Sequence, residues 1–322
     1  MSGPRSPRST PTTSPASSRR ASGGRRQTLA GLPKQLVLIS VGSALAVIAV
    51  YLLLVRTYWG QRLDEYAFSG REVISDVRAG QANEFLGVVS IGSLILVTVL
   101  IAAVAFARRR PRLALLAAGS MIAAVASTEV LKLVLLERPI LYPSILDVLN
   151  VHDNTYPSGH ATIGMTVALA TLLVLPARVR VLTTLAAGAV GSAFGVAVVA
   201  AGWHRPSDVV GAYFVALAAA ALAAAVANAF PDREAAEAEA ERAPALRLGR
   251  AELVLAALAL AVIALFGLAA LAIRGIPWTS SGAGFLISSA ALVALAFAVA
   301  AALAWGMTAA EARSSGPART PF

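Results

Sequence analysis

The hydrophobic residues of this chain fall into eight long, nearly uncharged runs separated by shorter polar segments. The runs occupy roughly 35–55, 85–107, 112–136, 160–176, 182–202, 207–229, 253–273 and 284–306. Most of them approach the roughly 20 residues that a helix needs to cross a bilayer. Because lipid offers no partner to an unpaired backbone N–H or C=O group, each run is expected to be a helix. The pattern predicts an all-α, polytopic membrane helix bundle.

Composition agrees with this prediction. Of the 322 residues, 57% are hydrophobic and 14% are charged, whereas a soluble domain has about 25% charged residues. A large soluble helical protein is the disfavoured alternative, because eight successive apolar runs of this length have no soluble counterpart. Cysteine is absent, which excludes a disulfide, a thiolate metal site and a cysteine nucleophile.

The polar segments divide the chain into five parts. Residues 1–33 are rich in Ser, Pro, Thr, Gly and Arg without apolar periodicity, and we expect a disordered cytoplasmic tail there. The predicted remainder is a six-span core at 34–229, a cytoplasmic linker at 230–252, two further spans within 253–306 and a cytoplasmic tail at 307–322. The last two spans carry no unusual polar residue, so we assign them a packing or partner role.

The distribution of Lys and Arg between the runs predicts the orientation in the membrane. Seven basic residues and no acidic residue precede the first run: Arg5, Arg8, Arg19, Arg20, Arg25, Arg26 and Lys34. Although the net charge is +10, this clustering indicates a cytoplasmic anchor to anionic lipid and not a nucleic-acid surface. Arg108, Arg109, Arg110 and Arg112 make the segment after the second run basic as well. The assignment gives a multi-pass protein of the cell membrane with both termini cytoplasmic.

Three polar clusters interrupt the apolar pattern at run ends on the extracytoplasmic side. They are "KLVLLERP" with Lys132 and Arg138, "YPSGH" with Ser158, Gly159 and His160, and "WHRPSD" with His204, Arg205 and Asp208. Ionisable residues within or beside spans are costly and indicate function by default. The clusters are therefore the candidate site.

The first two clusters suit a phosphate group. Lys132 and Arg138 are fixed cations that match its charge. Ser158 can cap the fourth span, and Gly159 lets the backbone N–H groups of that helix N-terminus approach an anion closely.

The histidines add a possible nucleophile and a possible acid. His204 and Asp208 are four positions apart, so on a helix they would share a face. A carboxylate at Asp208 can hold Nδ1–H of His204 and leave Nε2 free as a nucleophile. His160 would then protonate a leaving alkoxide.

In their order, "K…RP", "PSGH" and "H-x-x-x-D" resemble the type 2 phosphatidic acid phosphatase family, which also includes vanadium-dependent haloperoxidases. The resemblance covers about residues 84–228, and weakly "TYWGQRLDE" after the first span. It implies that Lys132, Arg138, Ser158 and Gly159 bind phosphate, that His160 is the general acid, and that His204, oriented by Asp208, becomes a phosphohistidine. It also implies that no metal and no other cofactor is needed.

Two departures from the family pattern affect the phosphate site. Five residues, not the usual six, separate Lys132 from Arg138, so the two can share a ligand only if the helix ends before Arg138. Pro139 favours such an end. The Ser-Arg that usually opens the third motif is replaced by Ala197 and Val198. Arg205 is our candidate for the missing cation, with His152 or a residue of the 56–84 loop as alternatives.

The sequence thus predicts an integral membrane phosphatase that hydrolyses a lipid phosphate monoester or diphosphate at the extracytoplasmic face. The partner would be a membrane lipid phosphate or a polyprenyl phosphate or diphosphate, and the sequence does not select among them. The alternative is a non-catalytic relative that binds phospholipid or a protein partner. A phosphotransferase with the same intermediate is also open, whereas the lack of an evident inverted repeat disfavours a transporter.

Overall fold

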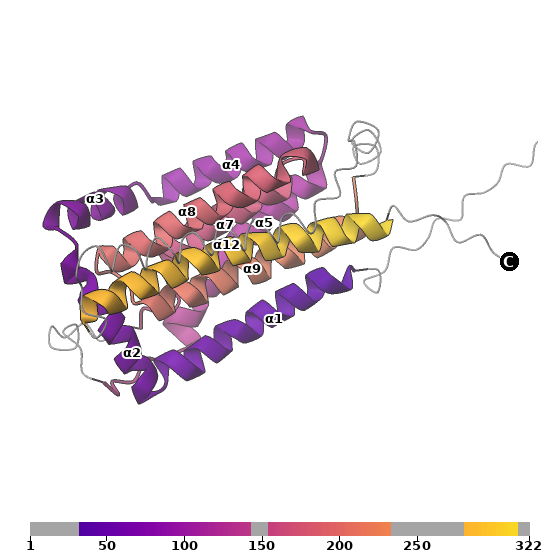
Figure 1. Cartoon of the computed structure of the whole chain (residues 1–322). Coiled ribbons are helices and arrows are strands. Elements are labelled where there is room, and N and C mark those ends of the chain that lie inside the picture. Colours follow the sequence, from indigo (N-terminus) through magenta and orange to yellow (C-terminus); the bar gives the residue numbers. More distant parts are fainter. Residues whose placement is uncertain (1–31, 143–153, 233–279, 315–322) are drawn as a thin grey trace, which may run out of the picture.

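The long helices of the protein lie side by side and run in roughly one common direction, and the short α2 lies across one end of the bundle (Figure 1). The computed structural model describes residues 32–142, 154–232 and 280–314, and this part of the chain contains helices and no strand. Among these described residues, five helices are long and apolar enough to cross a membrane, or six if one bent pair is a single span. The predicted all-α polytopic bundle is confirmed.

Most of the predicted runs coincide with a helix to within a few residues. The helices are α1 (Lys34–Val50) continued by the π-helical turn η2 (Tyr51–Val55), α4 (Ile91–Ala107), α5 (Pro111–Val130) continued by the π-helical turn η4 (Leu131–Leu135), α7 (Gly159–Val174), the short η5 (Ala177–Val179) leading into α8 (Arg180–Ala200), α9 (Pro206–Ala229) and α12 (Ser281–Ser314). The predicted run at 253–273, residues 1–31 of the tail, most of the linker and His152 lie outside the described residues.

The 56–84 segment, expected to be a loop, is largely helical. It contains α2 (Tyr58–Ser69), η3 (Gly70–Val73) and the first part of α3 (Asp76–Gly87). The predicted span at 85–107 corresponds to α4 preceded by the end of α3, and these two helices meet at a bend of 63° that hydropathy did not indicate. Ser90 starts α4 afresh: its hydroxyl accepts a hydrogen bond from the backbone N–H of Ser93, 3.1 Å away.

Helix α9 lies at the centre and packs against α1, α5, α7 and α12. The face that it buries consists largely of alanines, among them Ala212, Ala216, Ala220 and Ala224. Small side chains let helix backbones approach closely, which favours association within a membrane. Large apolar side chains such as Leu38, Leu115 and Leu133 point outward instead and are at least 70% exposed, as expected for a surface that faces lipid.

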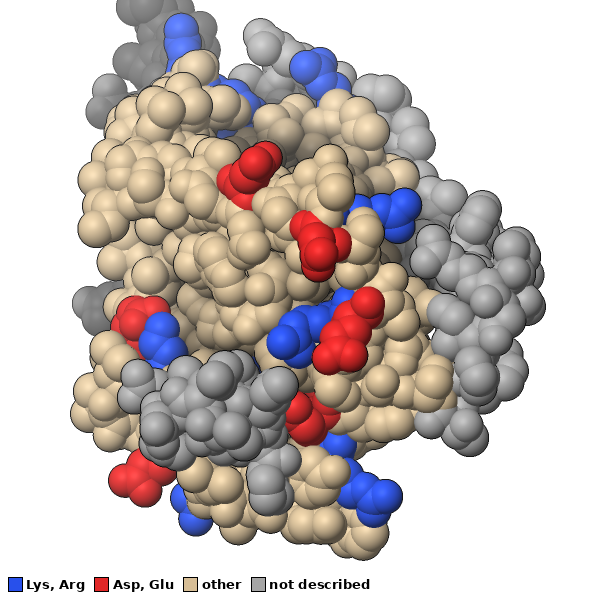
Figure 2. All heavy atoms as spheres, turned by 90° about the vertical axis from the view of Figure 1, so that its left-hand side faces the viewer, with Lys and Arg blue, Asp and Glu red and all other residues tan. Residues whose placement is uncertain are grey.

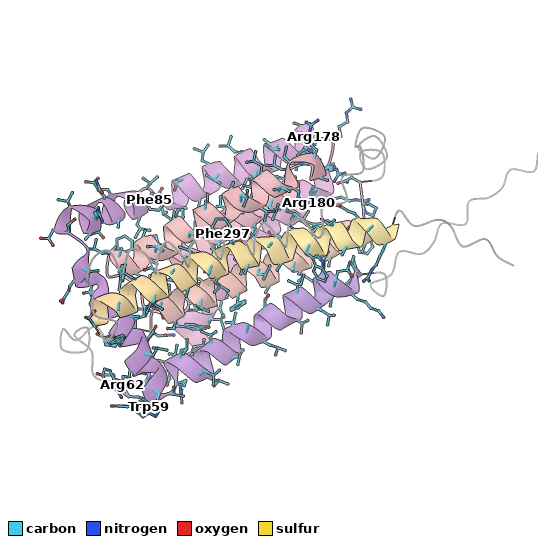
Figure 3. All side chains as sticks on the ribbon, viewed as in Figure 1. Trp59, Arg62, Phe85, Arg178, Arg180 and Phe297 are labelled. Atoms are coloured by element: carbon cyan, nitrogen blue, oxygen red, sulfur yellow. The ribbon has the colours of Figure 1, made fainter. Side chains whose placement is uncertain are left out.

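The two ends of the bundle differ in their polar contacts. At one end, Arg108 donates to the carbonyl of Val174, and Arg180 lies 2.6 Å from the Glu311 carboxylate of α12. The opposite end carries α2, α3 and the starts of α7 and α9; Figure 3 labels Arg180 at the first end and Trp59 at the second. The basic segments between spans therefore lie far from the starts of α7 and α9.

The last helix is part of the same core. Helix α12 packs along α8 and α9, and the N-terminal end of α12 contacts α2. The hydroxyl of Tyr66 on α2 donates to the carbonyl of Ser280, 2.6 Å away, just before α12. Of the packing or partner role expected for the last two spans, the structure shows packing for α12.

Candidate active site

The three polar clusters of the sequence meet at the end of the bundle that carries α2. Acidic and basic side chains are interspersed on this end of the molecule (Figure 2). The second cluster forms the start of α7, and the third forms the turn from α8 into α9. The first cluster begins with Lys132 inside η4 and continues past the end of η4 to Arg138.

The start of α7 is tied to the start of α9. The hydroxyl of Ser158 accepts a hydrogen bond from the backbone N–H of Ala161, 3.3 Å away, so Ser158 caps α7 as predicted. The backbone N–H of Ser158 donates to the carbonyl of Asp208 at 3.0 Å. The second and third clusters are therefore joined through the main chain.

A tight turn between α8 and α9 places His204. Gly202 has φ of 77°, a left-handed conformation that glycine adopts without strain. The carbonyl of Val198 then accepts the N–H groups of Trp203 and His204, at 3.0 and 3.2 Å. The Val198 side chain is fully buried in the apolar core.

His204 and Asp208 contact each other, but not by sharing a helical face. Nδ1 of His204 lies 3.4 Å from Oδ2 of Asp208. Because Pro206 is the first residue of α9, His204 precedes the helix and turns back onto its first turn. The predicted pairing is present, and the predicted reason for it is wrong. When Nδ1 carries the proton, Nε2 is left unprotonated.

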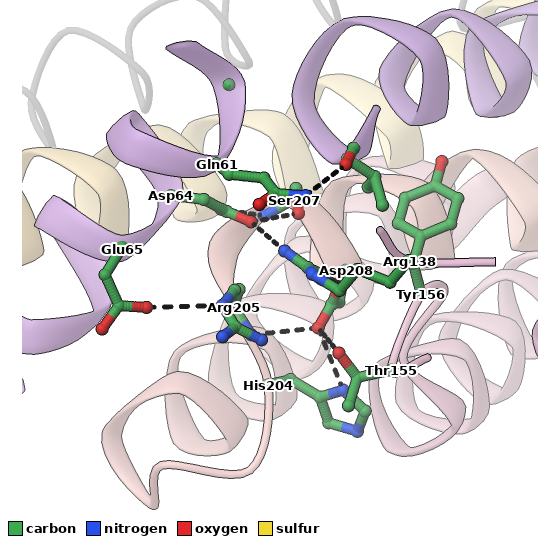
Figure 4. A network of polar contacts seen from close by, with 12 residues as sticks. Gln61, Asp64, Glu65, Arg138, Thr155, Tyr156, His204, Arg205, Ser207 and Asp208 are labelled. Carbon is green, nitrogen blue, oxygen red and sulfur yellow. Dashed lines mark hydrogen bonds and ion pairs between the residues drawn. The ribbon is translucent and has the colours of Figure 1, made fainter. Parts of the chain in front are cut away.

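Asp208 is held by several donors at once. It is fully buried, and its Oδ2 accepts the hydroxyl of Thr155 at 2.7 Å and the backbone N–H of Arg205 at 3.1 Å. Its other oxygen, Oδ1, accepts Arg138 at 3.1 Å. Figure 4 shows these contacts converging on the carboxylate. Such saturation fixes the carboxylate and, through it, the imidazole of His204.

Arg138 is shared between two buried carboxylates. One guanidinium nitrogen contacts Asp208, and the other lies 3.1 Å from Oδ2 of Asp64 in α2. Burial on its own would lower the pKa of Arg138, but the Asp208 and Asp64 carboxylates raise that pKa above its usual value. Arg138 is therefore a permanent cation, oriented by Asp64 and Asp208.

Lys132 points toward the start of α7. The helical path ends at Leu135, and Leu136 is extended, so the helix stops before Arg138 as the spacing requires. Nζ of Lys132 lies 2.7 Å from the carboxylate of Glu129. A Cβ at position 159 would lie 3.3 Å from that carboxylate and 3.9 Å from Nζ. Glycine thus keeps the space between Lys132, Glu129 and the α7 N-terminus open.

His160 and Arg205 flank the pair of His204 and Asp208. The His160 ring meets the Trp203 ring edge to face, with centroids 5.0 Å apart. The Arg205 guanidinium lies 3.5 Å from the carboxylate of Glu65 and over the Phe68 ring, both on α2. Within the described part of the chain, no group of three or more His, Asp or Glu side chains is arranged to hold a metal ion.

All of the site residues predicted from the sequence fall within one stretch of the chain. Residues 85–232 match the family model of the PAP2 superfamily. This region belongs to the PAP2 superfamily. No curated protein and no solved structure matches the chain in the corresponding comparisons.

Some residues that the structure places at the site were not predicted from the sequence. Glu129 lies inside the PAP2 region, whereas Asp64 and Glu65 precede it. Glu129 stands three positions before Lys132, a spacing typical of a helical ion pair, and could have been recognised on that ground. Asp64 belongs to the weakly similar stretch "TYWGQRLDE", and only the folded chain shows its contact with Arg138.

Proposed function

We propose that this PAP2 protein is an integral membrane phosphatase that hydrolyses a lipid phosphate monoester or diphosphate. The observation that carries the proposal is the contact between His204 Nδ1 and the buried, multiply bonded Asp208. A binding site needs cations for phosphate, but it does not need an imidazole that is oriented so as to leave Nε2 free.

The reaction would proceed in two displacements. Nε2 of His204 attacks phosphorus, a phosphohistidine forms, and His160 gives its proton to the departing lipid oxygen. Water then attacks the phosphohistidine, His160 takes a proton from it, and phosphate leaves as Nε2 is regenerated. Asp208 stabilises the charge on His204 in both steps through Nδ1–H.

Cations and a helix N-terminus would hold the phosphate. Lys132 lies beside Gly159, where Ser158 and the first N–H groups of α7 present a positive helix end. Arg138 contacts the carboxylate of Asp208, and Arg205 directly follows His204 in the chain. These side chains supply the positive charge that the transition state requires, so activity should persist in EDTA.

The charge distribution supports a site on the extracytoplasmic face of the cell membrane. The Arg-rich segments after α4 and α7 lie at the end of the bundle opposite to the site, and positive loops favour the cytoplasm. Both termini would then be cytoplasmic, and the basic N-terminal tail would contact anionic lipid.

One observation favours the alternative of a non-catalytic binding relative. Val198 is a buried apolar residue at the position where the third motif usually has arginine, and loss of one charge-assisted contact can cost several kcal/mol in a transition state. Such a protein would bind lipid phosphate without turning it over.

The test is phosphate release by the purified protein across a panel of lipids. The panel comprises phosphatidic acid, phosphatidylglycerophosphate, a polyprenyl diphosphate and a prenyl-linked sugar phosphate, each assayed with EDTA. We expect release from at least one lipid and none from His204→Ala. Binding of these lipids without release by the wild-type protein would instead support the alternative.

A further inference from the structure

Helix α2 precedes the PAP2 region, yet three of its polar residues reach the candidate site. Gln61, Asp64 and Glu65 lie three and four positions apart, which places them on one face of the helix. All three are buried. Polar side chains are buried at a cost unless they are paired, so this face must be matched by donors and acceptors.

Gln61 fixes the chain directly after Arg138. Its amide nitrogen donates to the carbonyl of Pro139. Its amide oxygen accepts the backbone N–H groups of Leu141 and Tyr142, both at 3.0 Å. Helix α2 therefore holds the segment that presents the Arg138 guanidinium.

Asp64 joins Arg138 to the start of α9. Its Oδ2 lies 3.1 Å from the Arg138 guanidinium and also accepts the hydroxyl of Ser207. Its Oδ1 accepts the backbone N–H of Ser207 at 2.9 Å. One carboxylate of α2 therefore contacts both Arg138, which bonds the Asp208 side chain, and Ser207, which immediately precedes Asp208 in the chain (Figure 4).

We propose that Asp64 is a positioning residue for the nucleophile and acts through Arg138 and Asp208. The inference rests on the proposed phosphatase function of the same site. Asp64 holds one side of the guanidinium, so Arg138 bonds only Oδ1 of Asp208. Oδ2 of Asp208 then stays available to Nδ1 of His204.

Without the charge on Asp64, this division of contacts is lost. Arginine readily binds a carboxylate through both of its oxygens, and Arg138 would be free to do so with Asp208. The guanidinium would then compete with His204 for Oδ2. The site would also become more positive by one charge, so an anion should bind at least as tightly as before.

The test compares Asp64→Asn with Asp76→Asn, the same change at an exposed acid on α3. We measure kcat and KM for the best lipid of the panel, and orthovanadate binding as a probe of the phosphate site. For Asp64→Asn we expect kcat to fall by about 10- to 100-fold, as for partners that orient a functional side chain. KM and the Kd for vanadate should stay within about threefold of wild type or decrease, and Asp76→Asn should match wild type.

Two further variants keep the test decisive if Asp64→Asn does not fold. Asp64→Glu keeps the charge and should retain more activity than Asp64→Asn. Ser207→Ala removes one hydrogen bond to Asp64 and should lower kcat by about threefold to tenfold without weakening vanadate binding.

The outcomes separate the two proposals. An active wild-type enzyme with an equally active Asp64→Asn, or with unchanged kcat in Ser207→Ala, would overturn the inference alone. A parallel loss of turnover and vanadate binding would also overturn it, because that pattern indicates collapse of the site. A wild-type protein that neither releases phosphate nor binds vanadate would overturn the proposed function together with the inference.

Discussion

The carboxylate of Asp64 lies 3.1 Å from the guanidinium of Arg138, 74 positions further along the chain. Asp64 belongs to a helix that precedes the PAP2 region, and Arg138 lies within it. The site is therefore completed by a part of the chain that the family model does not cover. The far side of that helix is in turn covered by α12, which follows the PAP2 region.

This packing predicts that a small change on α12 affects the site. A Cβ at Gly284 would lie 2.6 Å from ring carbons of Tyr66 on α2, closer than side chains tolerate. Gly284→Ala should therefore displace α2, lower the free energy of unfolding by about 1–3 kcal/mol and reduce kcat. Thermal unfolding in detergent and phosphate release measure the two effects.

The matched control is Gly42→Ala on α1, where a Cβ would meet no atom within 4 Å. That variant should be neutral or slightly stabilising, because alanine has the higher helix propensity. Equal behaviour of the two glycine variants would show that the contact between α12 and α2 is unimportant.

The second prediction concerns Arg205 as the cation that replaces the arginine absent at Val198. If Arg205 contacts phosphate, Arg205→Gln should lower kcat/KM by about 10²-fold, as removal of one preorganised donor does. Glu65→Gln removes the carboxylate beside the Arg205 guanidinium and leaves the cation in place. It should cost less than tenfold, and steady-state kinetics of both variants provide the measurement.

If the two substitutions instead reduce kcat/KM equally, Arg205 serves to tether α2 and does not bind phosphate. The third phosphate contact would then have to come from another residue. Unchanged kinetics in Arg205→Gln would likewise remove it from the site.

The third prediction concerns sidedness and uses the absence of cysteine from the chain. Arg78, at the end of the bundle that carries α2, and Arg109, after α4, are both exposed, so a single cysteine can be placed at each position. A membrane-impermeant thiol reagent added outside intact cells should label Arg78→Cys and not Arg109→Cys. Lysed cells are the control, because both cysteine variants should react there. The reverse labelling pattern in intact cells would place the site on the cytoplasmic side.

Hydropathy alone predicted most of the bundle, because a long apolar run in lipid can only be a helix. Helices α2 and α3 carry no such signal: they are short and mix charged with apolar residues, and we expected a loop there. A local signal for α2 was present at Thr57, whose hydroxyl caps the helix by accepting the N–H of Gly60. The break before α4 was missed because Ser90 interrupts the apolar pattern at one position only.

The candidate site was predicted to a different degree at each residue. His160, His204 and Asp208 stand out as rare polar groups in an apolar chain, and the structure brings them to one end of the bundle. The contact of His204 with Asp208 forms around an N-terminal turn, because Pro206 delays the start of α9. Asp64 carries no comparable signal, since its role depends on a tertiary contact that no spacing in the sequence encodes.

The central claim is that Nε2 of His204 accepts the phosphoryl group, and trapping of the phosphoenzyme tests it most directly. Purified protein is mixed with a ³²P-labelled lipid phosphate, quenched in alkali and digested, and the labelled peptide is identified. We predict an alkali-stable, acid-labile label on the peptide that contains His204, and no label in His204→Ala or after acid treatment. Turnover of the lipid with the label on another residue, or at an undiminished rate in His204→Ala, would contradict the account.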